Sequence, residues 1–258
     1  MPDRPFHITA IPALSDNYIW LLETADGQCA VVDPGEAQPV MAALAARGLD
    51  LAYILLTHHH YDHVDGVPEL LRHYPATVCG PADDRLPFVH KACHEGEDIR
   101  LEGLGITFLV LEIPAHTRSH VAFYGHGALF CGDTLFSVGC GRLFEGTAED
   151  MQRALDKLAA LPAGTEVYCA HEYTQSNCAF ALAVEPDNPA LQRRATEVDR
   201  LRSSGEITLP STLADELSCN PFMRTRQDSV IEAARGLDPQ ASAGASTMGV
   251  IRAWKDRF

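Results

Sequence analysis

The sequence has no segment that would place the chain in a membrane. Among its 258 residues, no apolar run approaches the ~20 residues that are needed to span a bilayer. The N-terminal segment Met1–His7 also lacks the pattern of a charged stretch followed by an apolar one that marks a signal peptide. We therefore expect a cytoplasmic protein without a membrane partner.

Paired cysteines are absent as well. The chain has eight cysteines but no C-x-x-C pair, and three of them, Cys29, Cys131 and Cys169, lie inside apolar runs. This pattern is typical of buried thiols in a reducing compartment. We expect neither a disulfide framework nor a zinc ribbon.

Positive charge is scarce. The net charge of −15 argues against nucleic acid as a partner, because phosphate binding needs a basic surface. The segment Asn220–Phe258 is an exception, since it carries six cations and four anions while the remaining residues carry a net charge of −17. This basic segment indicates a small anionic ligand, although cations near a helix C-terminus would explain it equally well.

The motifs of several large enzyme classes are missing. The sequence contains no G-x-S-x-G nucleophile motif and no P-loop. The segment Gly139–Gly141 lacks the third glycine of a dinucleotide-binding fingerprint, so we interpret it as a tight turn. Cys140 within that turn is better explained as a packing residue than as a nucleophile.

A dense cluster of metal-binding side chains follows one predicted strand. An apolar run over residues 51–56 predicts a buried strand, and Thr-His-His-His-Tyr-Asp-His follows at Thr57–His63. Without a cation, these imidazoles would partly protonate and repel one another. The residues that alternate with the expected ligands, His59 and Tyr61, should point away from the metal. The ligands that we expect from this segment are His58, His60, Asp62 and His63, which suit zinc, iron or manganese.

The first two thirds of the chain alternate between strand and helix patterns. This rhythm is typical of α/β proteins. The predicted strands cover 29–32, 51–56, 77–80, 106–111, 121–124, 128–131 and, as the last one, 166–170. Two predicted helices cover 40–46 and 67–73, and a third begins after a capping box at Thr147.

Three further ligand-type side chains lie at or just past predicted strand ends. In sheet-based α/β folds, functional groups gather at the edge where loops leave the strands. A single histidine there would be weak support, because a lone histidine is more often structural. Together with the cluster at Thr57–His63, however, they complete a set of ligands for two metals. The predicted sets are His58, His60 and His116 for one metal, Asp62, His63 and His171 for the second, and Asp133 as the bridging carboxylate.

Beyond His171 the sequence becomes helical. Asn188 and Pro189 are typical of the N-cap and first turn of a helix that continues through Leu201. Shorter helical patterns follow, and no strand of comparable strength appears among them. We expect two domains, residues 1–173 and 174–258, without a flexible linker.

With these residues in hand, the chain resembles the glyoxalase II family of hydroxyacylglutathione hydrolases within the metallo-β-lactamase superfamily. The superfamily motif T-H-x-H-x-D-H, matched at Thr57–His63, leaves lactamases, lactonases, nucleases and persulfide dioxygenases open. The narrower resemblance runs through almost the whole chain. It rests on the segments Leu14–Tyr18, Gly132–Phe136, Gly139–Arg142, Phe144–Thr147, His171–Thr174, Asn220–Arg224 and Arg252–Asp256.

The resemblance implies an αββα sandwich with a two-metal site, followed by a helical domain that helps to bind glutathione. The implied reaction is hydrolysis of S-D-lactoylglutathione to D-lactate and glutathione, the second step of methylglyoxal detoxification. We expect a monomer with two divalent metal ions, zinc ahead of iron or manganese, and a catalytic role for Asp62 and Asp133. The glutathione contacts implied are Arg142, Tyr173, Arg252 and Lys255. Phe144 stands where some members have a tyrosine, and phenylalanine cannot make the hydrogen bond of that hydroxyl.

The chemistry of such a site suits a thioester. Two metals that share Asp133 can lower the pKa of a bridging water from ~15.7 toward ~7 and can polarise the carbonyl. The leaving thiolate has a conjugate acid with a pKa near ~8.5, so it needs no dedicated general acid.

Two other hypotheses remain. A binding protein with structural metals disagrees with the His/Asp ligand set, because structural zinc sites close with four ligands and favour cysteine. A persulfide dioxygenase of the same superfamily would use one iron, whereas the presence of Asp62, His63 and His171 favours two metals. The number of metals per chain separates these alternatives.

Overall fold

The computed structural model describes residues 4–258. Met1–Asp3, the start of the segment whose composition argued against a signal peptide, lies outside the described residues. Spatial contacts divide the chain into two compact units. The first comprises the residues up to Glu112 together with Ser119–Gly132, and the second comprises Ile113–Arg118 and Asp133–Phe258.

The first unit contains a mixed six-stranded sheet. Its strands are, in spatial order, β1 (Phe6–Ala13), β2 (Asn17–Thr24), β3 (Gln28–Val32), β4 (Asp50–Leu55), β5 (Thr77–Pro81) and β6 (Lys91–Cys93). β1, β2 and β3 pair antiparallel, and the pairs from β3 to β6 are parallel. Parallel neighbours need crossover connections, and those from β3 to β4 and from β4 to β5 are helical, whereas β5 and β6 are joined by a loop. The helices are α1 (Ala37–Arg47), the single turn α2 (Tyr61–Val64) and α3 (Val67–His73).

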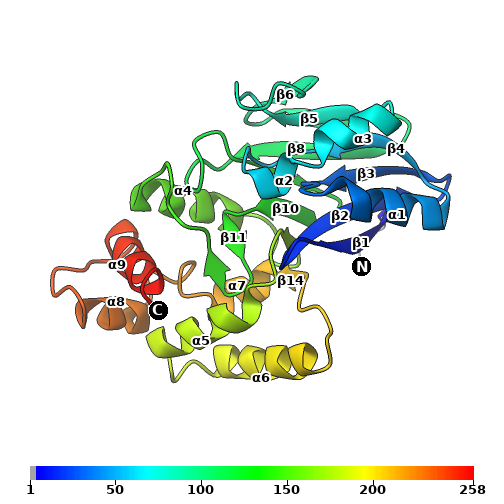
Figure 1. Cartoon of the computed structure of the whole chain (residues 1–258). Coiled ribbons are helices and arrows are strands. Elements are labelled where there is room, and N and C mark those ends of the chain that lie inside the picture. The colour runs from blue at the N-terminus through cyan, green and yellow to red at the C-terminus, as the bar shows by residue number, and fades with distance from the viewer. Residues whose placement is uncertain (1–3) are drawn as a thin grey trace. The chain divides into compact units, whose positions relative to one another are not determined.

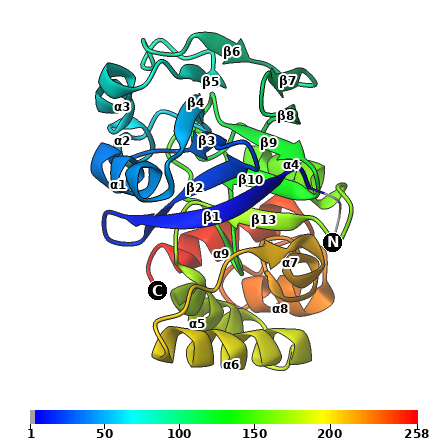
Figure 2. The same ribbon diagram turned by 90° about the vertical axis from the view of Figure 1, so that its right-hand side faces the viewer.

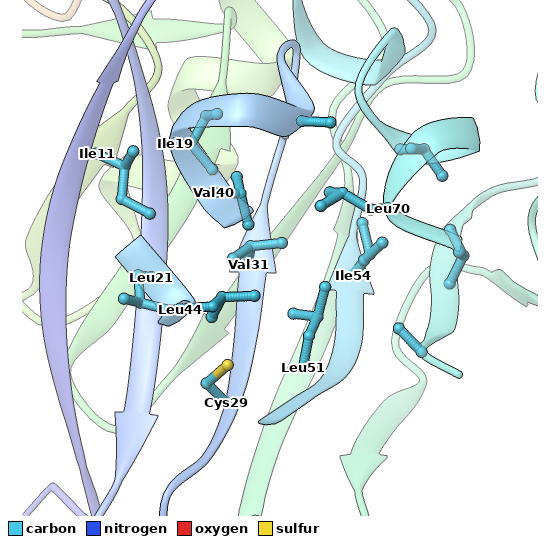
Figure 3. Packing of buried hydrophobic residues seen from close by; sticks show 14 of the residues in the cluster. Ile11, Ile19, Leu21, Cys29, Val31, Val40, Leu44, Leu51, Ile54 and Leu70 are labelled. Atoms are coloured by element: carbon cyan, nitrogen blue, oxygen red, sulfur yellow. The ribbon is translucent and has the colours of Figure 1, made fainter. Parts of the chain in front are cut away.

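Helices α1 and α3 cover one face of this sheet (Figure 2). Val40 and Leu44 on α1 are one helical turn apart, and both are buried against strand residues such as Val31 and Ile54 (Figure 3). Helix α1 ends at Gly48, whose φ of 66° closes the helix in the left-handed conformation and whose N–H donates to the carbonyl of Leu44. The apolar spacing and the cap therefore define the helix that the sequence predicted.

A second set of strands in the same unit is antiparallel. It consists of β7 (Asp98–Leu101), β8 (Ile106–Glu112), β9 (Val121–Gly125) and β10 (Ala128–Gly132), paired in that order (Figure 2). Phe6 on β1 meets Phe108 on β8 edge to face, with ring centroids 6.1 Å apart. Contacts of this kind bury the second face of the first sheet, and for this reason β2 is buried along nearly its whole length.

The second unit is mainly helical. Its hairpin strands are β11 (Leu135–Phe136) and β12 (Gly139–Cys140), and β13 (Glu166–Cys169) pairs with the short β14 (Ser211–Thr212). Helices α5 and α6 lie side by side (Figure 1) over an apolar cluster that includes Val138. The helices are α4 (Ala148–Ala159), α5 (Thr174–Val184), α6 (Pro189–Ser203), α7 (Leu213–Cys219), α8 (Asp228–Arg235) and α9 (Ala245–Lys255).

Most sequence-based expectations for the elements are confirmed. Thr147 caps α4 in a capping box with Asp150, and Asn188 caps α6 through its side-chain oxygen. All eight cysteines are buried and free. In the described part of the chain, no helix is long and apolar enough to cross a bilayer.

Several short elements were not predicted. The expectation that 166–170 forms the last strand was wrong, because Ser211–Thr212 adds β14 beside it. Strands β6, β7, β11 and β12 were also missed. Such short strands have no readable periodicity and exist because a distant partner offers hydrogen bonds.

Candidate metal centre

The Thr57–His63 cluster lies where the chain leaves β4. His60 is the residue before helix α2, and Asp62 and His63 lie in its single turn. His58 and His63 have no exposed surface. The nearby backbone is tightly packed, because a Cβ atom on Gly35 would overlap the carbonyl oxygen of Asp62. These side chains therefore belong to a rigid segment.

The tautomer of His58 is fixed by a hydrogen-bond relay that begins at Asp33. The Thr57 hydroxyl donates to Asp33 Oδ2 over 2.6 Å, so its oxygen is left to accept a hydrogen bond from His58 Nδ1, 3.0 Å away. The proton of this imidazole is then on Nδ1. His58 Nε2 consequently presents its lone pair, as a metal ligand must.

Asp33 fixes His63 in the same way. His63 Nδ1 lies 3.0 Å from Asp33 Oδ2, and Thr57 N–H donates to the other carboxylate oxygen over 2.8 Å. The Nε2 atom of His63 is the ligand atom that remains, and it lies 3.5 Å from Asp62 Oδ2. Asp33, His58 and His63 could themselves form a cation site. The three hydrogen bonds that Asp33 accepts make it better suited to orienting the histidines.

The second unit holds the other three predicted ligands. His116 Nδ1 donates to the carbonyl oxygen of Arg142 over 2.8 Å, which directs its Nε2 atom to Asp133 Oδ2 at 3.5 Å. His171 Nε2 lies 3.3 Å from the other carboxylate oxygen, Asp133 Oδ1. The two oxygens of Asp133 therefore face two different histidines. This is the arrangement that a carboxylate bridging two cations requires.

Gly141 makes this second cluster possible. A Cβ atom at this position would overlap the carbonyl oxygen of Asp133 and would lie 3.0 Å from His116 Nδ1. Any larger residue would therefore displace the ligands. The tight turn that the sequence predicted over Gly139–Gly141 is in fact β12 and the residue that follows it.

The donor atoms fit divalent cations in both units. A tetrahedral ion bound at about 2.0–2.1 Å holds its ligand atoms about 3.3 Å apart. His58 Nε2 and His60 Nδ1 are 3.1 Å apart, and the three imidazole–carboxylate distances above are 3.3–3.5 Å. Imidazole and carboxylate donors suit zinc, iron or manganese. The metallo-β-lactamase fold with these His/Asp clusters is therefore that of a protein that binds divalent metal ions.

Three residues that support these candidate ligands were not among the site residues predicted from the sequence. They are Asp33, Thr57 and Asn17, whose side-chain amide donates to both the carbonyl and the Oδ2 atom of Asp62 at 3.2 Å. A carboxylate immediately after the buried strand β3 was the available signal for Asp33. Of the two residues that alternate with the expected ligands, Tyr61 has 70% of its surface exposed. His59 faces Asp83, with Nδ1 3.7 Å from Oδ2.

The predicted glutathione contacts all lie in the second unit. Tyr173 stacks on His171, with ring centroids 4.7 Å apart and an angle of 6°. Asp256 Oδ1 lies 3.7 Å from Arg142 Nε and accepts from Arg252 Nη2 at 3.1 Å. Arg252 is only 6% exposed and also donates from Nη1 to the carbonyl of Cys140.

Lys255 is the fourth predicted contact. Its Nζ atom donates to the carbonyl of Ser176 and lies 5.2 Å from the ring centroid of Phe180. Burial, assisted by the charge of Arg252, lowers the pKa of Lys255 to about 8. Phe144, at the position where a tyrosine would add a hydroxyl, is 61% exposed and packs its ring against His116.

Comparison with known proteins agrees with this geometry. Residues 14–171 match the model of the metallo-beta-lactamase superfamily, and residues 172–258 match that of the hydroxyacylglutathione hydrolase C-terminus. The hydroxyacylglutathione hydrolase of Photobacterium profundum is 50% identical over 254 residues, which cover 97% of this chain and 99% of that protein. The chain belongs to the hydroxyacylglutathione hydrolase family.

Solved structures support the fold. The BLEG-1 B3 metallo-beta-lactamase matches with a TM-score of 0.63 at 21% identity, covering 84% of this chain and 99% of that one. TTHA1623, crystallised in a di-iron-bound form, matches with a TM-score of 0.54 at 31% identity, covering 64% of this chain and 91% of that one. The predicted α/β metallo-β-lactamase fold with a C-terminal helical region is confirmed.

Proposed function

We propose that this chain hydrolyses thioesters of glutathione with 2-hydroxy acids, with S-D-lactoylglutathione as the main substrate and D-lactate and glutathione as products. Membership of the hydroxyacylglutathione hydrolase family supports this reaction. The structural observation that supports it most is the carboxylate of Asp133, whose two oxygens face His116 and His171 separately.

The proposed ligand sets are those predicted from the sequence. Bound cations would polarise the thioester carbonyl and activate water for attack. The chain's own part is to present unprotonated nitrogens at fixed positions. The carboxylate of Asp33 and the carbonyl of Arg142 each accept a hydrogen bond from the Nδ1 atom of an imidazole ring, which leaves the Nε2 atom of that ring free to bind metal. We assign His58, His60 and His116 to one cation, Asp62, His63 and His171 to the other, and Asp133 to both.

Zinc is the metal that we propose, with iron or manganese as the alternatives. His/Asp donors do not select strongly among these ions. TTHA1623 was crystallised in a di-iron-bound form, which supports two metals in this chain. Asn17 donates a hydrogen bond to Oδ2 of Asp62, the oxygen that faces His63. This contact favours Asp62 as a ligand over Asp62 as a general base exposed to solvent.

We propose that the peptide part of the substrate is bound by Arg142, Tyr173, Arg252 and Lys255. Glutathione carries two carboxylates, and the three cations of this set gather near Asp256 and helix α9. Charge-assisted hydrogen bonds to carboxylates contribute about 1.5–3 kcal/mol each. Arg252 and Lys255 belong to residues 174–258, which we propose as a helical glutathione-binding domain, whereas Arg142 and Tyr173 belong to residues 1–173, the proposed metal-binding domain.

The proposal is tested by metal content and by substrate comparison. Elemental analysis of the pure protein should approach two metals per chain, and S-D-lactoylglutathione should be hydrolysed with release of free thiol. A lactoyl thioester without the peptide should react with a much higher KM. A chain with one iron that consumes oxygen with glutathione persulfide would refute the hydrolase assignment in favour of a dioxygenase.

Assembly and location are further parts of the proposal. We propose a monomer in the cytoplasm that has neither a nucleic acid nor a membrane partner, as the net charge of −15 suggested. Light scattering on the metal-loaded protein measures its mass in solution. A dimer mass would contradict the monomer without affecting the chemistry.

A further inference from the structure

The hairpin β11–β12 contains a backbone conformation that its sequence does not favour. The two strands are joined by Ser137 and Val138, and Val138 has a φ of 58°. A β-branched residue in the left-handed region is strained and persists only where its surroundings hold it. Something outside the hairpin must therefore supply this restraint.

The restraint comes from polar side chains of the second unit that reach the hairpin backbone. Glu216 and Asn220 have no exposed surface and make the most central contacts. Glu216 accepts from Val138 N–H over 2.8 Å, and Asn220 Nδ2 donates to the carbonyls of Phe136 and Gly139 at 3.2 and 2.9 Å and also to Glu216 Oε2. The other contacts are from Asn177 to Ser137 O, from Arg194 to Ser137 Oγ and from Arg252 to Cys140 O.

Both ends of this hairpin carry groups of the candidate metal centre. Asp133 comes two residues before β11, and Arg142, whose carbonyl accepts from His116 Nδ1, comes two residues after β12. Gly141 N–H donates to Thr134 O over 3.2 Å and closes the hairpin at its base. A change in the turn at Val138 would therefore shift Asp133 and the orientation of His116 together.

We propose that Glu216 is a positioning residue for the metal centre. It holds Val138 in its strained conformation and orients Asn220, which pins both strands, so that Asp133 stays in place for His116 and His171. The inference rests on the proposed metal site, but it assigns to the helical region a second role beside substrate binding.

Burying a carboxylate costs more desolvation free energy than burying an apolar side chain. Glu216 is fully buried, and burial raises the pKa of its carboxyl group above the ordinary value. An apolar side chain of the same size would fill the position with less desolvation. Such a side chain would lack the oxygen that accepts hydrogen bonds from Val138 N–H and Asn220. This difference makes the proposal testable.

The central experiment compares Glu216→Met with Glu216→Gln. Methionine keeps the volume but removes the acceptor, whereas glutamine keeps an acceptor oxygen. In chelator competition, Glu216→Met should raise the dissociation constant for zinc by about 10–100-fold, the effect of losing a partner that orients a ligand. Glu216→Gln should stay near the wild-type value. In the metal-free protein, the amide of Val138 should exchange faster with solvent in Glu216→Met than in the wild type.

Two further variants separate positioning from general stability. Glu185→Met removes a buried carboxylate of the same unit that accepts from Arg224 and Ser229 and has no contact with the hairpin among the hydrogen bonds above. It should lower the melting temperature but leave the zinc dissociation constant unchanged. Val138→Gly in the Glu216→Met background should restore part of the affinity, because glycine adopts the left-handed conformation without strain.

The outcomes that contradict the proposal are distinct. A Glu216→Met protein with the wild-type zinc dissociation constant would overturn the positioning role, as would an equal loss of affinity in Glu185→Met. A wild-type chain that takes up no metal would instead overturn the proposed metal centre. Amide exchange at Val138 would still report in that case whether Glu216 holds the hairpin.

Discussion

Replacing Asp33 by asparagine should reverse the tautomers of two histidines that we propose as metal ligands. Asp33 accepts from Thr57 N–H on Oδ1 and from the Thr57 hydroxyl and His63 Nδ1 on Oδ2. The asparagine oxygen has to stay at the backbone N–H, because an amide group placed there would bury two donors against each other. The amide group then takes the Oδ2 position and donates to His63 Nδ1. The ring proton moves to Nε2, the atom that should bind metal.

The same substitution reaches His58 through Thr57. With no acceptor at the Oδ2 position, the Thr57 hydroxyl can donate to His58 Nδ1, 3.0 Å away, and can accept from the new amide. His58 would then also carry its proton on Nε2. One substitution that leaves the shape of the site unchanged therefore disfavours coordination by two imidazoles.

The magnitude follows from these contacts. Loss of a group that orients a ligand lowers metal affinity by about 10–100-fold, which is about 1.4–2.7 kcal/mol, and two affected ligands place Asp33→Asn at the upper end. Three buried hydrogen bonds also lose a charged acceptor, at about 1 kcal/mol each, so the metal-free protein should be less stable by about 3 kcal/mol. Chelator competition measures the affinity, and nitrogen NMR of the imidazoles reports the tautomers.

Two controls decide whether tautomers or stability cause the loss. Asp26→Asn changes an aspartate of the same unit that also accepts from a threonine hydroxyl and a backbone N–H, and it should leave zinc binding unchanged. Asp33→Ala removes the acceptor without adding a donor, so it should destabilise the fold more but lose less metal affinity than Asp33→Asn. The reverse order of affinities, or a His63 in Asp33→Asn that still carries its proton on Nδ1, would refute the reasoning.

Further predictions concern the bridging ligand, the metals and the substrate contacts. Asp133→Ala should lose metal and reduce kcat by about a hundredfold or more, and unchanged metal content with normal turnover would contradict the bridge. Chelation should lower the melting temperature by about 5–10 °C, because metal at about 100 times its dissociation constant adds about 2.7 kcal/mol. Lys255 loses its charge as the pH rises through its pKa of about 8, so KM for lactoylglutathione should rise above that pH in the wild type. In Lys255→Met, KM should be high and independent of pH, and a rise that persists in this variant would assign it to another group.

The fold was predictable where local signals are strong. Helix α3 begins and ends at the predicted residues, Val67 and His73, and Thr147 caps α4 as its sequence pattern indicated. These elements are defined by residues three or four positions apart. The two-residue strands β11 and β12 have no such signal, since they exist because α7 and the residues after it supply hydrogen bonds to their backbone.

The clustering of the candidate ligands could be predicted from residue type and position, but their supporting residues could not. A histidine after a strand end is visible in the sequence, whereas the role of Asp33 depends on residues 24 and 30 positions away. Glu216 lies 78 residues from the backbone group that it holds. An ordinary glutamate on an amphipathic helix and a buried positioning residue look the same until the partner across the fold is known.

Arg252 shows where an inference from spacing alone is incomplete. The sequence places Arg252 and Lys255 three residues apart, so both can project from one face of a helix toward an anion. In the structure, the Nη1 atom of Arg252 already donates to the carbonyl of Cys140 at the end of β12, while Lys255 donates to Ser176 on α5. Arg252 therefore links the proposed substrate contacts to the hairpin that follows Asp133. Its replacement should disturb both substrate binding and the proposed metal ligands, whereas the substitution of Lys255 reports on substrate binding by itself.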